Sequence, residues 1–494
     1  QNDRLWDFQE GRSSPCLGEI DRGERKQESC TIIMAAGVTG QAYTTRYAEF
    51  VCNTRFEDLT PKVIDQAKIL VLDLIGVSLA GYKLMEFPRL VSDYIASLGG
   101  TAEASIFLRK GKFPAINAAF VNATCAHALD MDDGHRFGAL HPGAVVIPTG
   151  IAAAELVNAT TRSLIAGIVA GYEVMIRVGM AINPSSLRRG FHTTGTAGVF
   201  GATATAANIM GLNQEETEGA FGLAGLQASG FLQVNHEVEG AKVKPINPAR
   251  AAMAGLLSCI LAQRGVRGPR YILEGEDGFL RAVADEVDAN LLTQNLGTDF
   301  EICNVYLKLY AACRHTHASI DAAIEALKKR WVPASEIKEI VVETYSAAIR
   351  LAGIREATTV SAARFSIPFS VALVLTKGGA GAAQFSEENV QDEKIQALAQ
   401  KVRLAVGSKW EKAYPQKRGA TVTIIDKEGN RWSAEVELAK GEPENPATWE
   451  EIYQKFLQNG AIALPERQAE YLAEVIGKLE QAALEDFTRL IRCE

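Results

Sequence analysis

One short segment concentrates much of the chain's titratable chemistry. The stretch HALDMDDGHRFGALHPGAVVIP, residues 127–148, holds three aspartates, three histidines and one arginine between stretches rich in Ala, Val, Ile and Leu. Its carboxylates could form a solvated turn or bind magnesium, because hard cations prefer clustered carboxylates. Histidine and aspartate are also the residue types that transfer protons near neutral pH. The segment therefore predicts a site in this turn.

Three further polar segments interrupt otherwise apolar sequence. They are RRGFHTTGTAG at 188–198, GAKVKPINPARAA at 240–252 and NVYLKLYAACRHTH at 304–317, and all seven histidines fall between 127 and 317. His, Lys and Asp rarely enter a core unless they are paired. We therefore expect the four segments to meet around one buried polar pocket.

Each candidate residue also has a plain structural interpretation. His192 precedes a predicted helix start, where free N–H groups favour an anion, but it could equally be a surface histidine beside a capping threonine. Lys244 and Lys308 could simply extend their ammonium groups to solvent. His315 and His317 could be half of a transition-metal site, although no Cys or His follows them at zinc-finger spacing. The residues alone leave these alternatives open.

The composition excludes several classes of protein. With 47% hydrophobic and 22% charged residues over 494 positions, the chain has ordinary globular composition and enough material for two domains. A formal charge of −8 argues against nucleic acid or an anionic membrane as partner, so we expect a small molecule. Charges such as Glu173 and Arg177 interrupt the long apolar stretches, so no membrane span is expected. The eight cysteines lack C-x-x-C spacing, as is typical of reduced thiols in a cytoplasmic protein.

Helical patterns dominate the first three fifths of the chain. Residues 1–40 are polar and irregular and are expected to form a disordered extension. Residues 41–303 are predicted to form a helical large domain, in which apolar residues recur at helical spacing after Thr60 and Pro61. The segments GTAGVFGATATAANIMG and GAFGLAGLQASG predict helices that approach one another closely. A cofactor loop is the alternative, but neither segment follows a predicted strand.

The pattern changes after Cys303. Residues 304–440 are predicted to form an α+β lid domain, because ATVTIIDKEGNRWSAEVEL resembles two alternating strands around a Lys-Glu-Gly-Asn turn. After the linker KGEPENPAT, residues 441–494 are expected to form two amphipathic helices that return to the large domain. The last of these helices is predicted over PERQAEYLAEVIGKLEQAALEDFTRLIR. The expected fold class is therefore mainly α with an α+β part.

In their order along the chain, these segments resemble the MmgE/PrpD family, which contains 2-methylcitrate dehydratases, cis-aconitate decarboxylases and an iminodisuccinate epimerase. The resemblance runs from about residue 45 to 490 and is carried by LDMDDGHRFGALHPGA, GFHTTGTAGVFGATATAA, Lys244-Pro245, LKLYAACRHTH and KGEPENPAT. It implies an active site in the cleft between a helical domain and an inserted lid, with no metal and no organic cofactor. It also implies a homodimer, for which the Gly/Ala-rich helices would offer flat apolar faces.

The resemblance assigns catalytic roles to five residues: Asp130, His141, His192, Lys244 and Lys308. Two lysines and two histidines in one pocket would depress one another's pKa, which leaves one as a neutral base while the others hold carboxylates. Asp130 would orient a histidine or keep one cation charged. The expected substrate-contacting residues are Asp133, Gly134, His135, Arg136, Asn247, Arg250, Tyr310, Arg314, His317 and Phe369.

Three positions depart from the family's usual pattern. Gly134 stands where Thr often follows the paired aspartates, Asn247 where a His usually follows the first lysine, and Phe369 where the lid often has Tyr. These changes leave the proton-transfer residues in place but alter the residues expected to contact substrate. The sequence therefore does not identify the acid.

The resemblance and the residue types together predict a cofactor-independent lyase, either a dehydratase or a decarboxylase. It would remove a proton α to a carboxylate of a small di- or tricarboxylic acid, using fixed cations to stabilise the enolate-like centre. An epimerase or isomerase with the same base chemistry and a non-catalytic carboxylate-binding protein remain alternatives. Lid closure is expected to carry Lys308 toward the substrate.

Overall fold

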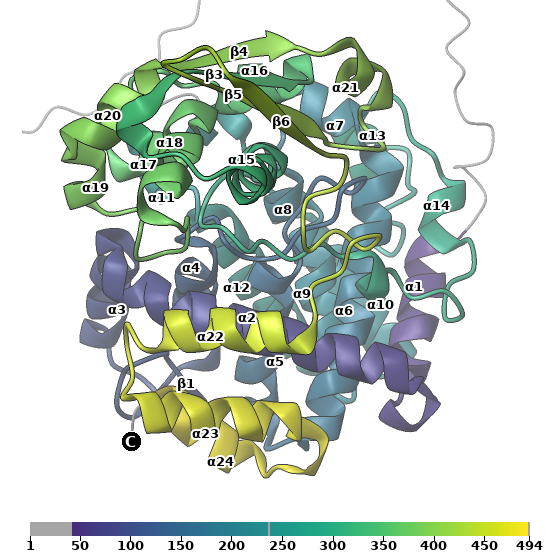
Figure 1. Ribbon diagram of the computed structural model, residues 1–494. Helices are drawn as coiled ribbons and strands as arrows, with labels where there is room; N and C mark the ends of the chain where they lie inside the picture. Colours follow the sequence, from purple (N-terminus) through teal and green to yellow (C-terminus); the bar gives the residue numbers. More distant parts are fainter. Residues whose placement is uncertain (1–41, 236–237, 493–494) are drawn as a thin grey trace, which may run out of the picture.

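Residues 42–235 and 238–492 are described by the computed structural model in Figure 1. The prediction for residues 1–40 lies outside this range. The described chain is mainly helical, with one two-stranded and one four-stranded sheet, which confirms the predicted fold class.

Helix α2 (Pro61–Leu84) forms where its start was predicted. The hydroxyl of Thr60 accepts a hydrogen bond from the backbone N–H of Val63 at 3.4 Å, and Pro61 occupies the first turn, where its missing N–H costs nothing. Its apolar residues are buried against α4 (Ala115–His127) and α22 (Trp449–Gly460). The helix therefore joins the beginning of the chain to its end.

The Gly- and Ala-rich helices lie inside the helical body. Helix α9 (Gly198–Met210) packs against α6 (Thr161–Ile182) and α12 (Ile246–Gln263), and a Cβ added at Gly201 would lie 2.6 Å from the Cβ of Met175. Small residues thus permit the close approach that the sequence predicted. The remaining elements of this body are α1 (Tyr43–Asn53), α3 (Glu86–Ser97), β1 (Ala104–Ser105), β2 (Lys112–Phe113), α5 (Gly143–Val157), α7 (Ser185–Arg188), α8 (Thr193–Thr196), α10 (Gln214–Gly225), α11 (Val238–Val243), α13 (Phe279–Val283) and α14 (Asn290–Thr293).

Helix α6 alone among the described residues is long and apolar enough to cross a membrane by length and composition. The expectation that its charged residues would exclude such a stretch is therefore wrong. The apolar stretch of α6 is completely buried inside the protein, as in the core helix of a soluble protein. Its charges are also satisfied, because Arg177 donates to Glu173 one turn earlier at 2.9 Å.

A four-stranded sheet forms the centre of the second body. Its strand order is β4-β3-β5-β6, with β3 (Ile337–Thr344) parallel to β4 (Val402–Val406) and the other neighbours antiparallel. Strands β5 (Ala420–Asp426) and β6 (Arg431–Val436) confirm the predicted pair, and Gly429 supplies the positive φ of their turn. Helix α15 (His317–Lys329) packs on this pair. The other helices are α16 (Ser346–Ala352), α17 (Val360–Ala363), α18 (Ile367–Lys377), α19 (Glu387–Gln391), α20 (Glu393–Gln400) and α21 (Ser408–Ala413).

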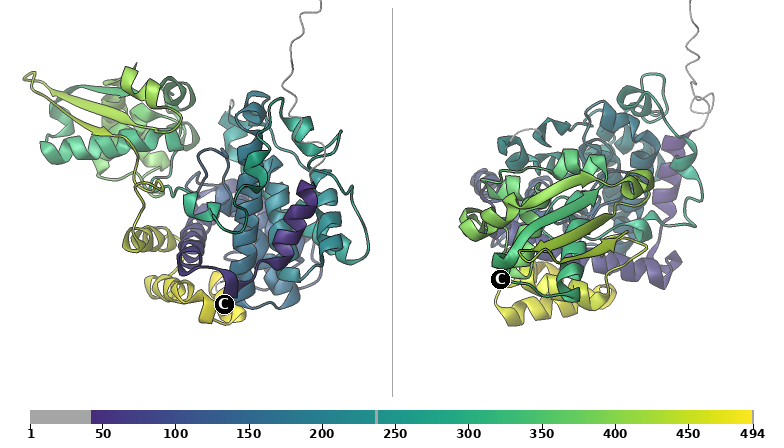
Figure 2. Two further views of the ribbon diagram at one scale, coloured as in Figure 1. Left: turned by 90° about the vertical axis from the view of Figure 1, so that its right-hand side faces the viewer. Right: turned by 45° about the horizontal axis from the view of Figure 1, so that its top comes forward.

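The sheet and its helices stand to one side of the helical body, as Figure 2 shows, and the chain crosses between the two bodies before α15 and after β6. We call this part the lid. Its apolar core also takes in Val77 and Ala80 of α2 and Leu129 and Met131 of the polar turn. The lid core therefore ends against the segment that carries the candidate chemistry. The domain boundaries at 303 and 440 stay predictions.

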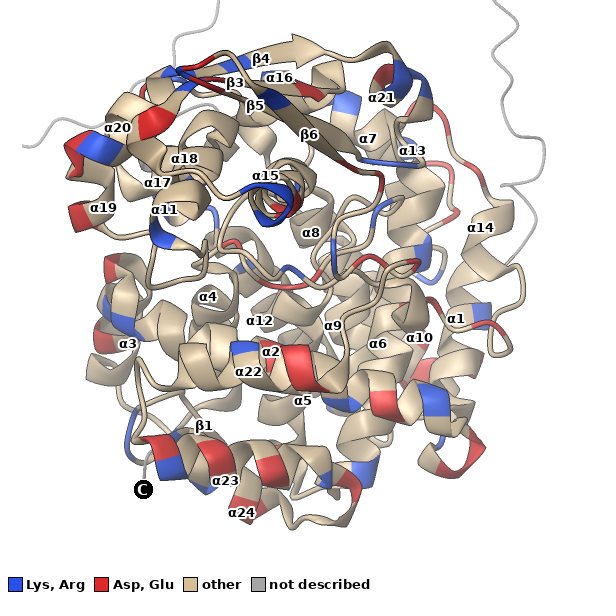
Figure 3. Ribbon diagram, in the orientation of Figure 1, with Lys and Arg blue, Asp and Glu red and all other residues tan. Residues whose placement is uncertain are grey.

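The C-terminal helices pack against the helical body. Helix α22 lies along α2, and its charged residues, like those of α23 (Glu466–Gly477), are of both signs (Figure 3). The prediction of one final helix over 465–492 is wrong, because the helical path breaks at Lys478 and resumes in α24 (Leu484–Arg492). The break lets Leu479 remain buried and brings Arg492 to within 3.4 Å of Glu155 on α5.

Candidate active site

Asp130 lies at the centre of a buried cluster of charges. Its φ of 51° is in the left-handed region, which Asp tolerates better than most residues. Lys308 donates to its backbone carbonyl at 2.8 Å and to its Oδ1 at 3.1 Å, and Lys244 donates to the same Oδ1 at 3.1 Å. The structure therefore brings together three predicted residues from separate segments.

The charges of this cluster support one another. Burial tends to raise the pKa of Asp130, but the Lys244 and Lys308 ammonium groups outweigh it and hold that pKa well below its usual value. Burial lowers the pKa of Lys308, but the carboxylates of Asp130 and Asp132 outweigh it and raise that pKa above its usual value. The expected mutual depression of pKa is thus wrong for Lys308, which is a permanent cation.

His141 lies beside this cluster as a neutral base. Burial first, and then the charge of Lys308, lower its pKa to about 3. Its Nδ1 lies 2.7 Å from the carbonyl oxygen of Asp133, which only accepts hydrogen bonds, so Nδ1 carries the proton. The Nε2 atom of His141 is consequently left with a free lone pair.

His192 is held by Asn247, another predicted residue. The amide of Asn247 donates to Nδ1 of His192 at 2.8 Å, so Nε2 carries the proton and can donate. Burial first, and then Lys244, hold the pKa of His192 well below its usual value. His192 is therefore a neutral donor, and the asparagine that departs from the family pattern sets its tautomer.

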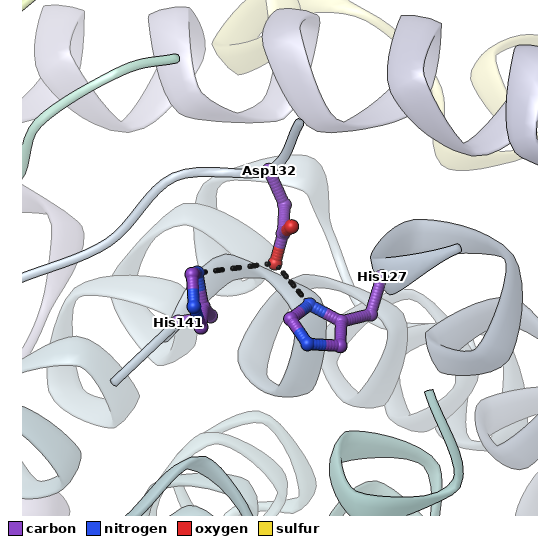
Figure 4. Close-up of side chains that lie close together, drawn as sticks. All are labelled: His127, Asp132 and His141. Carbon is purple, nitrogen blue, oxygen red and sulfur yellow. Dashed lines mark hydrogen bonds and ion pairs between the residues drawn. The ribbon is translucent and has the colours of Figure 1, made fainter. Parts of the chain in front are cut away.

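His127 was not predicted as a site residue, and Asp132 was predicted only as a carboxylate of a solvated turn or a magnesium ligand. Figure 4 shows the Asp132 carboxylate between two imidazole rings, 2.7 Å from Nδ1 of His127 and 3.6 Å from Nδ1 of His141. The Nε2 atom of His127 is buried without a hydrogen-bond partner among the described residues. Both residues belong to the segment 127–148. His127 is also the last residue of the Ala-rich helix α4, so its sequence context is that of a histidine in a helical core.

A small cavity adjoins these groups. Its volume is about 20 Å³, enough for about one water molecule, and it lies between the polar turn and the lid. The charged and titratable residues in its wall are His127, Asp130, Lys244 and Arg364.

One group of ligand types in the described residues could hold a metal ion. The ligand atoms of His127, Asp132 and His141 all lie within 4.8 Å of one another. However, the short Nδ1 contact between His127 and Asp132 uses the histidine nitrogen and carboxylate oxygen for a hydrogen bond to each other. This pairing is the arrangement of a base and the group that orients it.

Asp133 and Gly134 shape the turn. Asp133 accepts from the backbone N–H of Gly143 at 3.0 Å and from the hydroxyl of Tyr172 at 2.7 Å, and burial raises its pKa to about 8. Gly134 pairs with the backbone of Tyr306, and a Cβ at Gly134 would lie 2.4 Å from the Tyr306 hydroxyl. The close approach of Tyr306 accounts for glycine at this position.

A second polar cluster surrounds Glu442, which lies in the predicted linker KGEPENPAT. The Glu442 carboxylate is 1% exposed and pairs with Arg136 at 2.7 Å and with Arg314 at 2.8 Å. Arg314 in turn lies 3.1 Å from Nδ1 of His317, whose ring lies 5.1 Å from that of Tyr310. Four predicted substrate contacts, Arg136, Tyr310, Arg314 and His317, therefore form one cluster. It joins the polar turn, the segment 304–317 and the linker.

Three other predicted contacts lie apart from both clusters. His135 is 3.5 Å from Glu301, and Arg250 lines, together with Asn247, an open cavity of about 410 Å³. Phe369 is fully buried in the lid core near Phe385, so the structure does not bring it to the cavity.

Two family models and several known proteins match this chain. The MmgE/PrpD N-terminal domain matches residues 45–292, and the MmgE/PrpD C-terminal domain matches residues 310–481. Cis-aconitate decarboxylase of Aspergillus terreus (strain NIH 2624 / FGSC A1156) is 25% identical over 91% of this chain and 95% of its own length. Cis-aconitate decarboxylase of Homo sapiens is 24% identical over 90% and 93%, and 2-methylcitrate dehydratase of Salmonella typhimurium is 22% identical over 87% and 92%. The two domain matches cover most of the sequence, and the chain belongs to the MmgE/PrpD family.

Proposed function

We propose that this protein is a cofactor-independent lyase that removes a proton α to a carboxylate of a small di- or tricarboxylic acid and then releases water or CO2. The lyase class is supported by relatives named as decarboxylases and dehydratases of such acids. The observation that carries the mechanism is a pair of histidines sharing Asp132, next to two lysines sharing Asp130.

His127 is the proposed base. Its Nδ1–H points to Asp132, its Nε2 lacks a partner among the described residues, and its side chain lines the cavity. A proton taken by Nε2 would convert the ring to an imidazolium facing the Asp132 carboxylate. This arrangement stabilises the charged base without a further rearrangement.

The lysines are proposed to stabilise the enolate-like intermediate. Lys244 and Lys308 are fixed by Asp130 before substrate arrives, so no reorganisation is required when negative charge develops on the substrate carboxylate. In a dehydration, the intermediate then expels the β-hydroxyl group, which leaves as water after gaining a proton. In a decarboxylation, the bond to CO2 breaks and leaves its electron pair on carbon, so the product takes up two protons, the one returned by the histidine and one from solvent.

A product screen tests this function. The protein is incubated with cis-aconitate, 2-methylcitrate and other di- and tricarboxylates, with and without EDTA, and the mixtures are followed by proton NMR. We expect an unsaturated product or loss of CO2 from at least one acid, at a rate that EDTA leaves unchanged. One tightly bound metal ion per chain that is required for activity would contradict cofactor independence. Inversion of the substrate without unsaturated product or CO2 would instead establish the epimerase alternative.

A further inference from the structure

We propose that Arg364 of the lid binds a second carboxylate of the substrate and so couples substrate binding to lid closure. This inference rests on the proposed function, because it assumes a substrate with at least two carboxylates.

Lys308 cannot be the cation that the lid delivers. Its neighbour Tyr306 exchanges two backbone hydrogen bonds with Gly134, at 3.0 and 2.8 Å, and Leu307 donates to the carbonyl of Gly441 at 2.9 Å. Lys308 itself is bonded to Asp130. The segment is therefore fastened to the polar turn, and the expectation that lid closure carries Lys308 inward is not supported by its contacts.

Arg364 follows α17 and reaches from the lid to the helical body. Its side chain donates from Nη1 to the carbonyl oxygen of Ala128 at 3.2 Å and lies 3.7 Å from the sulfur of Met85. Its own carbonyl accepts from the N–H of Cys313 at 2.9 Å, which fixes its backbone within the lid. Arg364 thus forms part of the contact that closes the cavity.

The guanidinium of Arg364 is buried but incompletely paired. The residue is 3% exposed, its Nε has no hydrogen-bond partner among the described residues, and no described carboxylate forms an ion pair with it. Burial lowers its pKa to about 10, so it remains a cation at neutral pH. A buried cation in this condition is costly unless an anion arrives.

The charges around the cavity leave room for an anionic ligand. Lys244, Lys308 and Arg364 are three cations, and one carboxylate, Asp130, is shared by the two lysines. The neighbouring Asp132 carboxylate is already engaged with His127. A di- or tricarboxylate would supply the missing negative charge, and the planar guanidinium donates two parallel hydrogen bonds to a carboxylate.

The size of the cavity links this binding to movement of the lid. A volume of about 20 Å³ does not admit a di- or tricarboxylic acid, so the lid must move away before the acid enters. When the lid returns, Arg364 meets a substrate carboxylate where it now has only neutral partners. The bound acid would therefore favour the closed state.

The test uses propane-1,2,3-tricarboxylate, which has neither a double bond nor a hydroxyl group and so binds without reacting. Isothermal titration calorimetry compares the wild type with Arg364→Met, Arg364→Lys and Arg403→Met. Arg403 is the control because it lies exposed on the lid strand β4 and pairs only with Glu339 at the surface. We expect at least a tenfold weaker affinity for Arg364→Met, an intermediate loss for Arg364→Lys and less than a twofold change for Arg403→Met.

A second measurement on the wild type does not depend on whether the variants fold. Hydrogen exchange of the amides in residues 359–366 should slow at least tenfold when the tricarboxylate is bound. Unchanged exchange there, or Arg364→Met binding within twofold of wild type at an unchanged melting temperature, would overturn the role of Arg364. Failure of the wild type to bind or turn over any di- or tricarboxylate would instead overturn the proposed function.

Discussion

Lys308 and His141 owe their opposite charge states to what surrounds them. Burial acts to lower the pKa of both groups. Two carboxylates reverse this effect for Lys308, whereas the charge of Lys308 reinforces it for His141. The same pocket therefore holds a fixed cation and a neutral histidine at pH 7, beside His127, the proposed base.

Replacing Lys308 should remove stabilisation of the intermediate. For Lys308→Ala we expect a loss of at least two orders of magnitude in kcat/KM, about 2.7 kcal/mol or more, with the fold intact. Steady-state kinetics on the identified substrate measures the loss. Lys328→Ala is the control, because Lys328 is exposed and pairs only with Glu325, and it should change kcat/KM less than twofold. Near-normal turnover by Lys308→Ala would contradict the two-lysine mechanism.

Asp133 should make stability depend on pH. Burial raises its folded pKa to about 8 from an ordinary value of 3.8, so its contribution to stability is complete below about pH 4 and is lost as the pH rises toward 8. Asn keeps an oxygen for the N–H of Gly143 but does not ionise. The free energy of unfolding of Asp133→Asn minus that of wild type should therefore be larger at pH 8 than at pH 4. We expect this increase to be at least about 1.4 kcal/mol, the equivalent of one pKa unit. Urea unfolding of both proteins at pH 4 and pH 8 measures these free energies. If variant and wild type differ by the same amount at both pH values, the raised pKa of Asp133 is wrong.

Among the secondary-structure elements, α22 has a direct bearing on the site. Its Lys455 pairs with Asp73 of α2 at 2.6 Å and donates to the carbonyl of Met131 at 3.1 Å, between the two site aspartates. Both Lys455 and Asp73 are buried, so neither has water as an alternative partner. Helix α22 therefore holds the polar turn in place.

Removing Lys455 should destabilise the fold and disturb the turn. For Lys455→Met we expect a loss of about 3–5 kcal/mol in the free energy of unfolding, because Asp73 is left as a buried charge. The double variant Asp73→Leu/Lys455→Met should regain at least half of this loss but not the full kcat, because Met131 still lacks its donor. Urea unfolding and steady-state kinetics give the two readouts. Lys427→Met, which breaks an exposed pair with Glu336, is the control and should cost less than about 1 kcal/mol.

Particular elements show what the sequence could predict. The start of α2 and the β5–β6 pair were predicted because their capping, periodicity and turn residues are local signals. The break after α23 was missed because apolar residues continue through it at helical spacing, although Gly477, the last residue of α23, is of a type that often ends a helix.

The same distinction applies to the site. Asp130, Lys244 and Lys308 stood out as charged residues in apolar sequence, and the structure places them within hydrogen-bonding distance. Arg364 and Glu442 carried no such signal, because their roles depend on contacts between segments far apart in the chain. Sequence spacing cannot supply such contacts.

At the scale of the whole molecule, the Gly/Ala-rich helices do not provide the outer faces that were expected to form a dimer contact. The Gly/Ala-rich helix α9, which was expected to offer a flat outer face, is buried almost throughout and packs against α6 and α12. The proposal of a homodimer therefore rests on the family resemblance. Sedimentation at micromolar concentration should give twice the 53.3 kDa chain mass, and a monomer would contradict it.

The most direct test of the account is solvent deuterium exchange at the carbon α to a substrate carboxylate. The acid that the product screen identifies is incubated in D2O with wild type, His127→Gln and Lys328→Ala, and NMR follows both deuterium incorporation and product. We expect His127→Gln, which cannot accept the proton, to lose at least two orders of magnitude in both rates, while Lys328→Ala matches the wild type. If His127→Gln folds normally and retains wild-type rates of exchange and product formation, His127 is not the base, and the proposed mechanism is wrong.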